Sequence, residues 1–383
     1  MTSTTERPLR LALDASAWCD GRGLGRYAAQ MATALAASGR VDLRPFAPDD
    51  DWGPWSLSPE LRERTTVWRS RYLPWLSYRL PRLVSREQPE VTWFPANEAA
   101  PWGCHPYILT IHDVAQAHFP ERFFSGVWEY RRYLRRLRGA VAGAARVVTD
   151  AACSADDLQQ LCGCHPEKLA VVPLGVEAAF RPAPAGEYQP VLQQHQVRQP
   201  YVLYVGGFDF RKNLPTLIEA FARLVSRGRP ETLILVGTRS RRPAMQPDLE
   251  AVVRKHRLGD KVIFLEGTVN DDTQLRALYS GAALFVFPSL FEGFGLPPLE
   301  AMACGTPVVC SQAASLPEVV GDAAVSVAAE DASVLAEAMR GVLEDEDRQA
   351  RLRSAGLLRA RLFTWTAAAE RLCDLASAVA RGT

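Results

Sequence analysis

Three groups of residues in this 383-residue chain have types and spacings that could do chemistry. The stretch SLFEGFGLPPLEAMACGTPVV, residues 289–309, places Glu292 and Glu300 around two glycines and two prolines. The apolar run before it predicts a buried strand, and the residues from Pro297 onward predict a helix with proline in its first turn. Since backbone amides at a helix N-terminus bind anions, this loop is typical of an anion site. Two carboxylates beside such a site make sense if the ligand also carries hydroxyl groups.

The second group is the segment YVGGFDFRKNLPTLIEAF. Gly206 and Gly207 end a predicted strand, and Arg211 and Lys212 follow just before a helix whose expected N-cap is Asn213. Two cations, a glycine turn and a helix N-terminus in one place favour a diphosphate ligand. A solvated Arg–Lys pair on the surface is the alternative for this segment.

The third group, ILTIHDVAQ, places His112 and Asp113 after the carboxyl end of an apolar strand, where a doubly wound fold presents functional side chains. A histidine at a strand end is also a common structural hydrogen-bonding residue, so His112 alone decides nothing. The loop CDGRGLGRY carries Gly21, Gly23 and Gly25 in front of a predicted helix. It lacks the full dinucleotide fingerprint, and a plain tight turn explains it equally well.

Other polar clusters have the residue types of metal sites. CGCH, residues 162–165, offers three zinc ligands, but structural zinc normally takes four, so a turn is the expected structure. The acidic runs at residues 49–51 and 345–347 lie in polar sequence and are expected to be solvated. Because Arg211 and Lys212 already supply positive charge, we expect no metal.

The elements that must position these groups alternate along the chain. Strands separated by helices throughout predict an α/β fold with two doubly wound, Rossmann-like domains. Residues 1–190 are expected to form the N-terminal domain and residues 191–365 the C-terminal domain, because residues 183–200 lose apolar periodicity as a linker would. Ligands of such folds bind beyond the carboxyl ends of the strands, near the cleft between domains.

The composition excludes several classes of protein. Hydrophobic residues make up 48% and charged residues 23%, which is typical of a soluble globular protein. With 44 basic and 43 acidic residues the net charge is +1, which gives no basis for a nucleic-acid partner. No apolar stretch approaches the roughly 20 residues that span a bilayer, and no signal peptide precedes the first strand. We therefore expect a cytoplasmic protein with reduced cysteines.

The motifs together resemble a known family. GGFDFRKNLPTLIEAF, LFVFPSLFEGFGLPPLEAMACGTPVV and TIHD, with RVVTDAACSADDL and VVPLGVE between them, resemble the retaining sugar-nucleotide glycosyltransferases of family four, which have the GT-B fold. The likeness runs from the GRGLGRY loop to the terminal FTWTAAAERL. The two-glutamate motif in its strand–loop–helix context is specific, whereas the separate glycine loops are not. The GRGLGRY form is most similar to mannosyl- and rhamnosyltransferases of surface-polysaccharide assembly.

The resemblance implies a role for each matched position. Glu300 would bind the nucleotide ribose, Glu292 would lie near the donor sugar, and His112 would lie near the anomeric centre of that sugar. Arg211 and Lys212 would hold the diphosphate, where negative charge grows as the leaving group departs. Further contacts to the donor are expected from Gly23, Gly25, Gly207, Val269, Phe294, Gly295 and Leu296.

The resemblance also implies an enzyme that transfers a hexose, with retention of configuration, from a nucleoside-diphosphate sugar to a carbohydrate hydroxyl. The active site would lie in the interdomain cleft, with the acceptor on the N-terminal domain, the donor on the C-terminal domain, and no metal or other cofactor. The terminal helix, residues 366–383, would pack back on the N-terminal domain. GDP-mannose is the favoured donor. A UDP- or dTDP-sugar transferase acting on a soluble metabolite or natural product stays open.

Three other functions fit parts of the pattern. A glycosidase also places two carboxylates around a glycosidic bond, but phosphate-binding features in the same loop would serve no purpose in a simple hydrolase. A phosphorylase would need inorganic phosphate and, in the best-known case, a lysine that carries pyridoxal phosphate, and no such lysine is identifiable. A catalytically silent subunit that binds nucleotide sugars stays open, although the intact motifs argue against it.

Two basic, aromatic stretches concern the acceptor. They are residues 67–87 and residues 123–139, and the second places Trp128 among five arginines of a predicted helix. Such a surface could lie on anionic lipid at the inner face of the plasma membrane and bring the enzyme to a lipid-linked glycan. Packing of the same aromatics inside the domain explains the pattern equally well.

Overall fold

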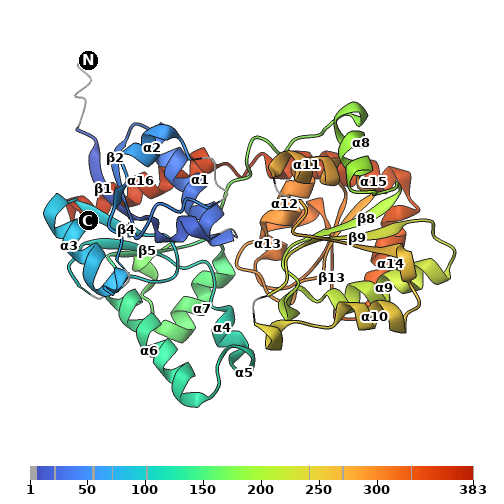
Figure 1. Ribbon diagram of the computed structural model, residues 1–383, viewed down its shortest axis with the longest axis horizontal. Coiled ribbons are helices and arrows are strands. Elements are labelled where there is room, and N and C mark those ends of the chain that lie inside the picture. Colours follow the sequence, from blue (N-terminus) through green and yellow to red (C-terminus); the bar gives the residue numbers. More distant parts are fainter. Residues whose placement is uncertain are drawn as a thin grey trace. The chain divides into compact units, whose positions relative to one another are not determined.

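The computed structural model describes residues 7–20, 23–53, 57–70, 72–100, 102–240, 242–269, 271–328 and 330–382. The chain forms two compact α/β units (Figure 1). The N-terminal unit consists of Met1–Gly175 and Thr364–Thr383, and the C-terminal unit of Val176–Phe363.

The N-terminal unit is built on a seven-stranded parallel sheet in the order β3-β2-β1-β4-β5-β6-β7. Its strands are β1 (Leu9–Asp14), β2 (Val41–Ala47), β3 (Thr66–Val67), β4 (Val91–Phe94), β5 (Tyr107–Thr110), β6 (Arg146–Thr149) and β7 (Leu169–Val171). The central strands are nearly continuous apolar runs, because helices cover both faces of a doubly wound sheet. The order reverses at β1 and β4, so the carboxyl ends of these strands mark the switch point of the unit.

The helices of this unit are α1 (Gly23–Ala37), α2 (Pro59–Glu63), α3 (Leu80–Glu87), α4 (Ala115–His118), α5 (Pro120–Phe123), α6 (Val127–Gly143), α7 (Ala152–Cys162) and α16 (Trp365–Arg381). The terminal helix α16 packs along α1 (Figure 1). Arg40, which follows α1, pairs with Asp374 of α16 at 2.7 Å. A Cβ on Gly175 would lie only 2.1 Å from the backbone nitrogen of Trp365. Only glycine therefore fits where the chain passes the start of α16.

The C-terminal unit contains a six-stranded parallel sheet in the order β10-β9-β8-β11-β12-β13. Its strands are β8 (Tyr201–Val205), β9 (Thr232–Gly237), β10 (Val262–Glu266), β11 (Leu284–Phe287), β12 (Val308–Ser311) and β13 (Val325–Val327). Its helices are α8 (Ala185–Gln194), α9 (Leu214–Ser226), α10 (Leu249–Lys255), α11 (Asp272–Gly281), α12 (Leu296–Ala303), α13 (Leu316–Val320), α14 (Ala332–Leu343) and α15 (Glu346–Ala360). Two doubly wound parallel sheets confirm the predicted fold class, and here the strand order reverses at β8 and β11.

The units divide at Gly175, which differs from the boundary predicted at residue 190. The segment expected to be a linker contains α8, which packs on α11 in the C-terminal unit. Leu192 of α8 is buried, and Glu187 pairs with Arg276 of α11 at 2.9 Å. The proline, glutamines and glycine of this segment hide its short apolar face, so composition alone indicated a linker.

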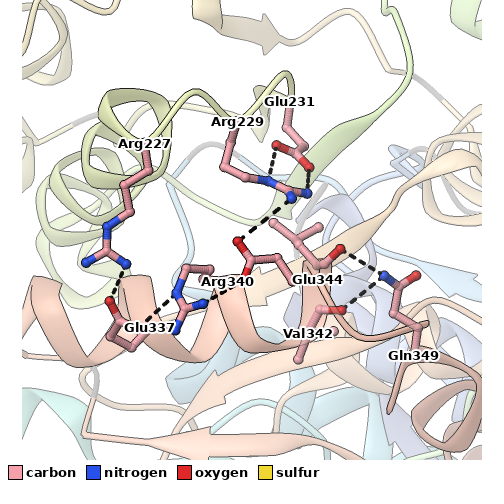
Figure 2. A network of polar contacts seen from close by, with 9 residues as sticks. Arg227, Arg229, Glu231, Glu337, Arg340, Val342, Glu344 and Gln349 are labelled. Atoms are coloured by element: carbon pink, nitrogen blue, oxygen red, sulfur yellow. Dashed lines mark hydrogen bonds and ion pairs between the residues drawn. The ribbon is translucent and has the colours of Figure 1, made fainter. Parts of the chain in front are cut away.

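A network of ion pairs ties α14 to the turn between α9 and β9 (Figure 2). Its charged members are Arg227, Arg229, Glu231, Glu337, Arg340 and Glu344. Most of these side chains are a third or more exposed, and such pairs contribute little each. Glu231 differs because it is 1% exposed and pairs with Arg229, so loss of that arginine would leave a buried charge without its cation. The network thus holds the end of α9, whose start follows the basic loop of the site.

Candidate active site

Two loops of the C-terminal unit bring half of the predicted site residues together. The first loop follows β8 and the second, residues 288–295, follows β11, the neighbouring parallel strand. Because the carboxyl ends of parallel strands share one edge of a sheet, the loops meet there. The Leu290 backbone N–H donates to the Arg211 carbonyl at 2.6 Å, which joins them directly. From the start of α13, the Ser315 hydroxyl lies 3.0 Å from the Glu292 carbonyl and 2.7 Å from the Phe294 carbonyl.

Lys212 and Glu292 form an ion pair across these loops. Lys212 Nζ donates to Glu292 Oε1 at 2.6 Å, and each side chain is 13% exposed. The ammonium also lies 5.7 Å from the centre of the Phe287 ring. The two residues are 80 positions apart in the chain, yet the sheet places a cation and a carboxylate in one partly buried location. A site of this kind can bind a phosphate and a hydroxyl side by side.

Arg211 is oriented by a residue that the sequence analysis did not select. Asp209 Oδ1 accepts from Arg211 Nε at 2.9 Å, and Asp209 Oδ2 accepts from Arg211 Nη2 at 3.3 Å. Burial raises the pKa of Asp209, but the charges of Arg211 and Lys212 lower it by more. The net pKa therefore lies below its usual value. The carboxylate therefore stays ionised and fixes the guanidinium. The only sequence signal was the two-residue spacing from aspartate to arginine.

The predicted cap of α9 is made differently. Asn213 occupies the N-cap position, but its φ is +54° and its side chain caps no backbone amide of the helix. Instead Asn213 Oδ1 accepts from the Thr216 hydroxyl at 2.7 Å. The expected side-chain cap is therefore wrong in its hydrogen bond, because the left-handed backbone turns the asparagine away from the first amides.

Glu300 lies on α12, where it is 2% exposed. Its Oε2 accepts from the Tyr279 hydroxyl of α11 at 2.8 Å. α12 begins after Gly295, whose φ of +111° suits glycine alone, and a Cβ there would lie 2.6 Å from Leu316 Cδ2. The glycine thus lets the chain turn tightly into the helix that carries Glu300.

The other predicted donor contacts of this unit also follow strands of the sheet. Gly207 comes two residues after β8, and Val269 comes three residues after β10. Phe294 is buried beside Gly295, and Leu296 is the first residue of α12. These positions all follow carboxyl ends of parallel strands, as the resemblance implies, and their contacts to a donor remain predictions.

His112 follows β5 in the N-terminal unit and is held by both ring nitrogens. Its Nδ1 lies 2.6 Å from Asp150 Oδ2, and its Nε2 lies 2.8 Å from the Pro95 carbonyl oxygen. A carbonyl oxygen can only accept, so Nε2 carries a proton, and Nδ1 shares a hydrogen bond with the Asp150 carboxyl group. Burial alone lowers the pKa of His112, but Asp150 and the Pro95 carbonyl raise it above its usual value.

Asp150 is a second residue of the candidate site that the sequence analysis did not select. It comes directly after β6, which pairs with β5, so the ends of both strands share one edge. Burial raises the pKa of Asp150, and the His112 charge opposes that rise. Ser154 lies in the first turn of α7, which begins at Ala152, and its hydroxyl donates to the His112 carbonyl at 3.1 Å.

The glycine loop after β1 is described in part. Gly23 is the first residue of α1, and a Cβ there would meet nothing within 4 Å. Gly25 is buried in the first turn of the same helix, whereas Gly21 lies outside the described residues. The expected role of Gly23 and Gly25 beneath the phosphates stays a prediction.

The two acidic runs that have the residue types of metal sites make structural contacts instead. Over the ranges that the structure describes, no group of three or more His, Cys, Asp and Glu residues could hold a metal ion, the CGCH segment included. Asp50 pairs with Arg69, and Asp345 accepts from the Arg348 backbone N–H at 2.8 Å as the cap of α15.

The two basic, aromatic stretches each contain an exposed aromatic side chain, which is Tyr72 at 93% in the first and Trp128 in the second. Within residues 67–87, Trp75 Nε1 donates to buried Asp14 at 2.7 Å, and the Arg79 guanidinium is buried. The start of α6 exposes Val127 by 62% and Trp128 by 82%. No helix among the described residues is both long and apolar enough to cross a membrane.

Comparison with known proteins assigns the family. The family model for Glycosyltransferase Family 4 matches residues 21–180, and the model for Glycosyl transferases group 1 matches residues 190–359. The chain is 34% identical over 263 residues to the O-antigen chain mannosyltransferase B of Escherichia coli, a match that covers 67% of this chain and 66% of that protein. It is 27% identical over 282 residues to the serotype-specific mannosyltransferase WbdA of Escherichia coli, covering 71% of this chain and 33% of that protein.

The fold comparison agrees. The structure aligns with the sucrose-phosphate synthase of Thermosynechococcus elongatus with a TM-score of 0.78 at 22% identity, over 98% of this chain and 100% of the other. The chain thus belongs to the glycosyltransferases with the GT-B fold, with a family 4 domain followed by a group 1 domain. The resemblance predicted from the sequence is confirmed.

Proposed function

We propose that the chain is a retaining glycosyltransferase that moves a hexose from a nucleoside-diphosphate sugar to a carbohydrate hydroxyl. The observation that carries the proposal is the pairing of Lys212 with Glu292 at 2.6 Å where two strand-end loops meet, beside Arg211. A cation for a phosphate and a carboxylate for a sugar hydroxyl lie side by side there. Glu300 adds a buried carboxylate for the ribose on the helix that follows the second loop.

The proposed chemistry is electrostatic. As the bond from the anomeric carbon to the β-phosphate oxygen breaks, negative charge grows on the leaving diphosphate. Lys212, Arg211 and the amides at the start of α12 stabilise that charge more in the transition state than in the ground state. Loss of one such donor costs about 3 kcal/mol in well-studied enzymes. No metal ion is part of this mechanism.

Retention follows from front-face attack in this proposal. The acceptor oxygen bonds to the anomeric carbon on the face that the diphosphate leaves, and the departing phosphate oxygen takes the acceptor proton. The contacts of His112 support this route, because both ring nitrogens are already hydrogen-bonded, to Asp150 and to the Pro95 carbonyl, and neither points to a substrate as a base or a nucleophile would. With its pKa raised by Asp150 and the Pro95 carbonyl, His112 would instead contribute positive charge near the donor sugar.

The proposed donor is GDP-mannose. Two relatives from Escherichia coli are named as mannosyltransferases, which favours mannose as the sugar. The proposed acceptor is a lipid-linked glycan at the inner face of the plasma membrane. Exposed Trp128 and Val127 at the start of α6, followed by five exposed arginines, support contact with an anionic lipid surface.

Calorimetric titration of GDP, UDP, ADP and dTDP into the wild-type protein and Glu300→Ala tests the donor site. We expect one nucleotide to bind tightly and to bind the variant more weakly, with GDP the favoured nucleotide. Glu344→Ala, which removes an exposed carboxylate of the same unit, is the control. Binding of none of the four would overturn the proposal. Binding without turnover of the matching sugar nucleotide would favour a catalytically silent subunit.

A further inference from the structure

Tyr279 connects the core of the C-terminal unit to a carboxylate of the proposed donor site. Its hydroxyl lies 2.8 Å from Glu300 Oε2, and both residues are buried. We propose that Tyr279 is a positioning residue: its hydroxyl fixes the Glu300 carboxylate in the orientation that accepts the ribose hydroxyls of the nucleotide. The inference rests on the proposed function, because it deepens the role assigned to Glu300.

The tyrosine is itself held rigidly. Its side chain is fully buried, and its ring makes edge contacts with Phe285 at 5.4 Å and Phe180 at 6.0 Å between ring centres. Its carbonyl accepts from the Thr306 hydroxyl at 2.6 Å. A donor fixed in this way imposes its position on the acceptor, because a charge-assisted O–H···O⁻ bond is short and directional.

The geometry leaves Glu300 suited to a sugar. A carboxylate offers about four acceptor positions, so one bond from Tyr279 is compatible with contact to two neighbouring hydroxyls. The hydrogen bond helps to hold the carboxylate in one orientation, which lowers the cost of ordering it when the nucleotide binds. Preorganisation of this kind strengthens binding by removing that cost.

A second buried tyrosine of the same unit, Tyr201, provides a control whose hydroxyl does not contact Glu300. Tyr201 begins β8, at the opposite end of that strand from the loop of the site, and its hydroxyl donates at 2.5 Å to the carbonyl of Leu278, the neighbour of Tyr279 in the chain. Tyr201→Phe and Tyr279→Phe remove the same atom from equally buried rings of the same unit. The pair therefore separates a general loss of stability from a specific effect on Glu300.

The test is the calorimetric affinity of GDP and of 2′,3′-dideoxy-GDP, or of the corresponding pair for whichever of UDP, ADP and dTDP binds instead. The wild-type protein should prefer the nucleotide that carries ribose hydroxyls. Tyr279→Phe should reduce that preference roughly tenfold, since a hydrogen bond to a charged group is lost. Tyr201→Phe should leave the preference unchanged, because a structural defect weakens both ligands alike.

The outcomes separate the inference from the function on which it rests. A wild-type preference that survives intact in Tyr279→Phe would overturn the positioning role and leave the proposed function standing. Equal binding of both analogues by the wild-type protein would overturn the ribose contact of Glu300 and the inference together. An equal loss of preference in both tyrosine variants would also contradict the inference, because the effect would then be structural.

Discussion

We predict that replacing Glu292 by glutamine strengthens the binding of GDP but slows turnover of the sugar nucleotide. In the structure Glu292 accepts from Lys212 Nζ at 2.6 Å, and each side chain is 13% exposed. A diphosphate that binds Lys212 must compete with this ion pair. A hydrogen bond to a charged group contributes about 1.5–3 kcal/mol, and glutamine retains part of it. We expect Glu292→Gln to bind GDP roughly tenfold more tightly, which corresponds to about 1.4 kcal/mol.

Turnover of the nucleotide sugar should change in the other direction. Glu292 is the proposed acceptor for a sugar hydroxyl, and loss of one transition-state contact typically lowers kcat by about 10²-fold or more. Calorimetry with GDP and initial rates with the sugar nucleotide measure the two effects on one variant. Glu219→Gln, an exposed carboxylate paired with Arg223 on α9, should change neither. Weaker GDP binding by Glu292→Gln would refute the competition between Glu292 and phosphate for Lys212.

Two further predictions concern the N-terminal unit. The raised pKa of His112 means that its contribution to stability is fully present below about pH 6.5 and is lost as the pH rises through the folded-state pKa. The loss of thermal stability in Asp150→Asn should therefore be larger at pH 6 than at pH 9. A pH-independent loss would contradict this. Charge reversal of three exposed arginines of α6 should weaken binding to phosphatidylglycerol vesicles about 10²-fold, at about 1 kcal/mol per arginine, and leave phosphatidylcholine vesicles unaffected. These arginines are Arg131, Arg132 and Arg135, and Arg353→Glu on α15 is the control; unchanged vesicle binding would remove α6 from the proposal.

The sequence predicted the fold class because strands and helices alternate with clear apolar periodicity in both units. It placed Lys212 and Glu292 in one donor site through the family resemblance, but it did not predict their ion pair. The two residues are 80 positions apart, and they meet because both follow parallel strands whose carboxyl ends share an edge of the sheet.

The partners that orient the site residues could not be predicted in the same way. Asp150 contacts His112 across 38 positions, and Tyr279 contacts Glu300 across 21, through side-chain directions that depend on packing. Neither aspartate nor tyrosine is unusual at such a position, so no pattern in one sequence selects them.

The central claim is that the C-terminal unit binds the nucleotide of a sugar donor through Glu300. Titration of GDP into the wild-type protein and Glu300→Ala tests it most directly, with UDP, ADP and dTDP in parallel. The account predicts tight binding of one nucleotide and a loss of roughly 10²-fold or more in the variant, since a buried carboxylate that bonds two hydroxyls is removed. Equal affinity of both proteins for the bound nucleotide, or no binding of any of the four, would contradict it.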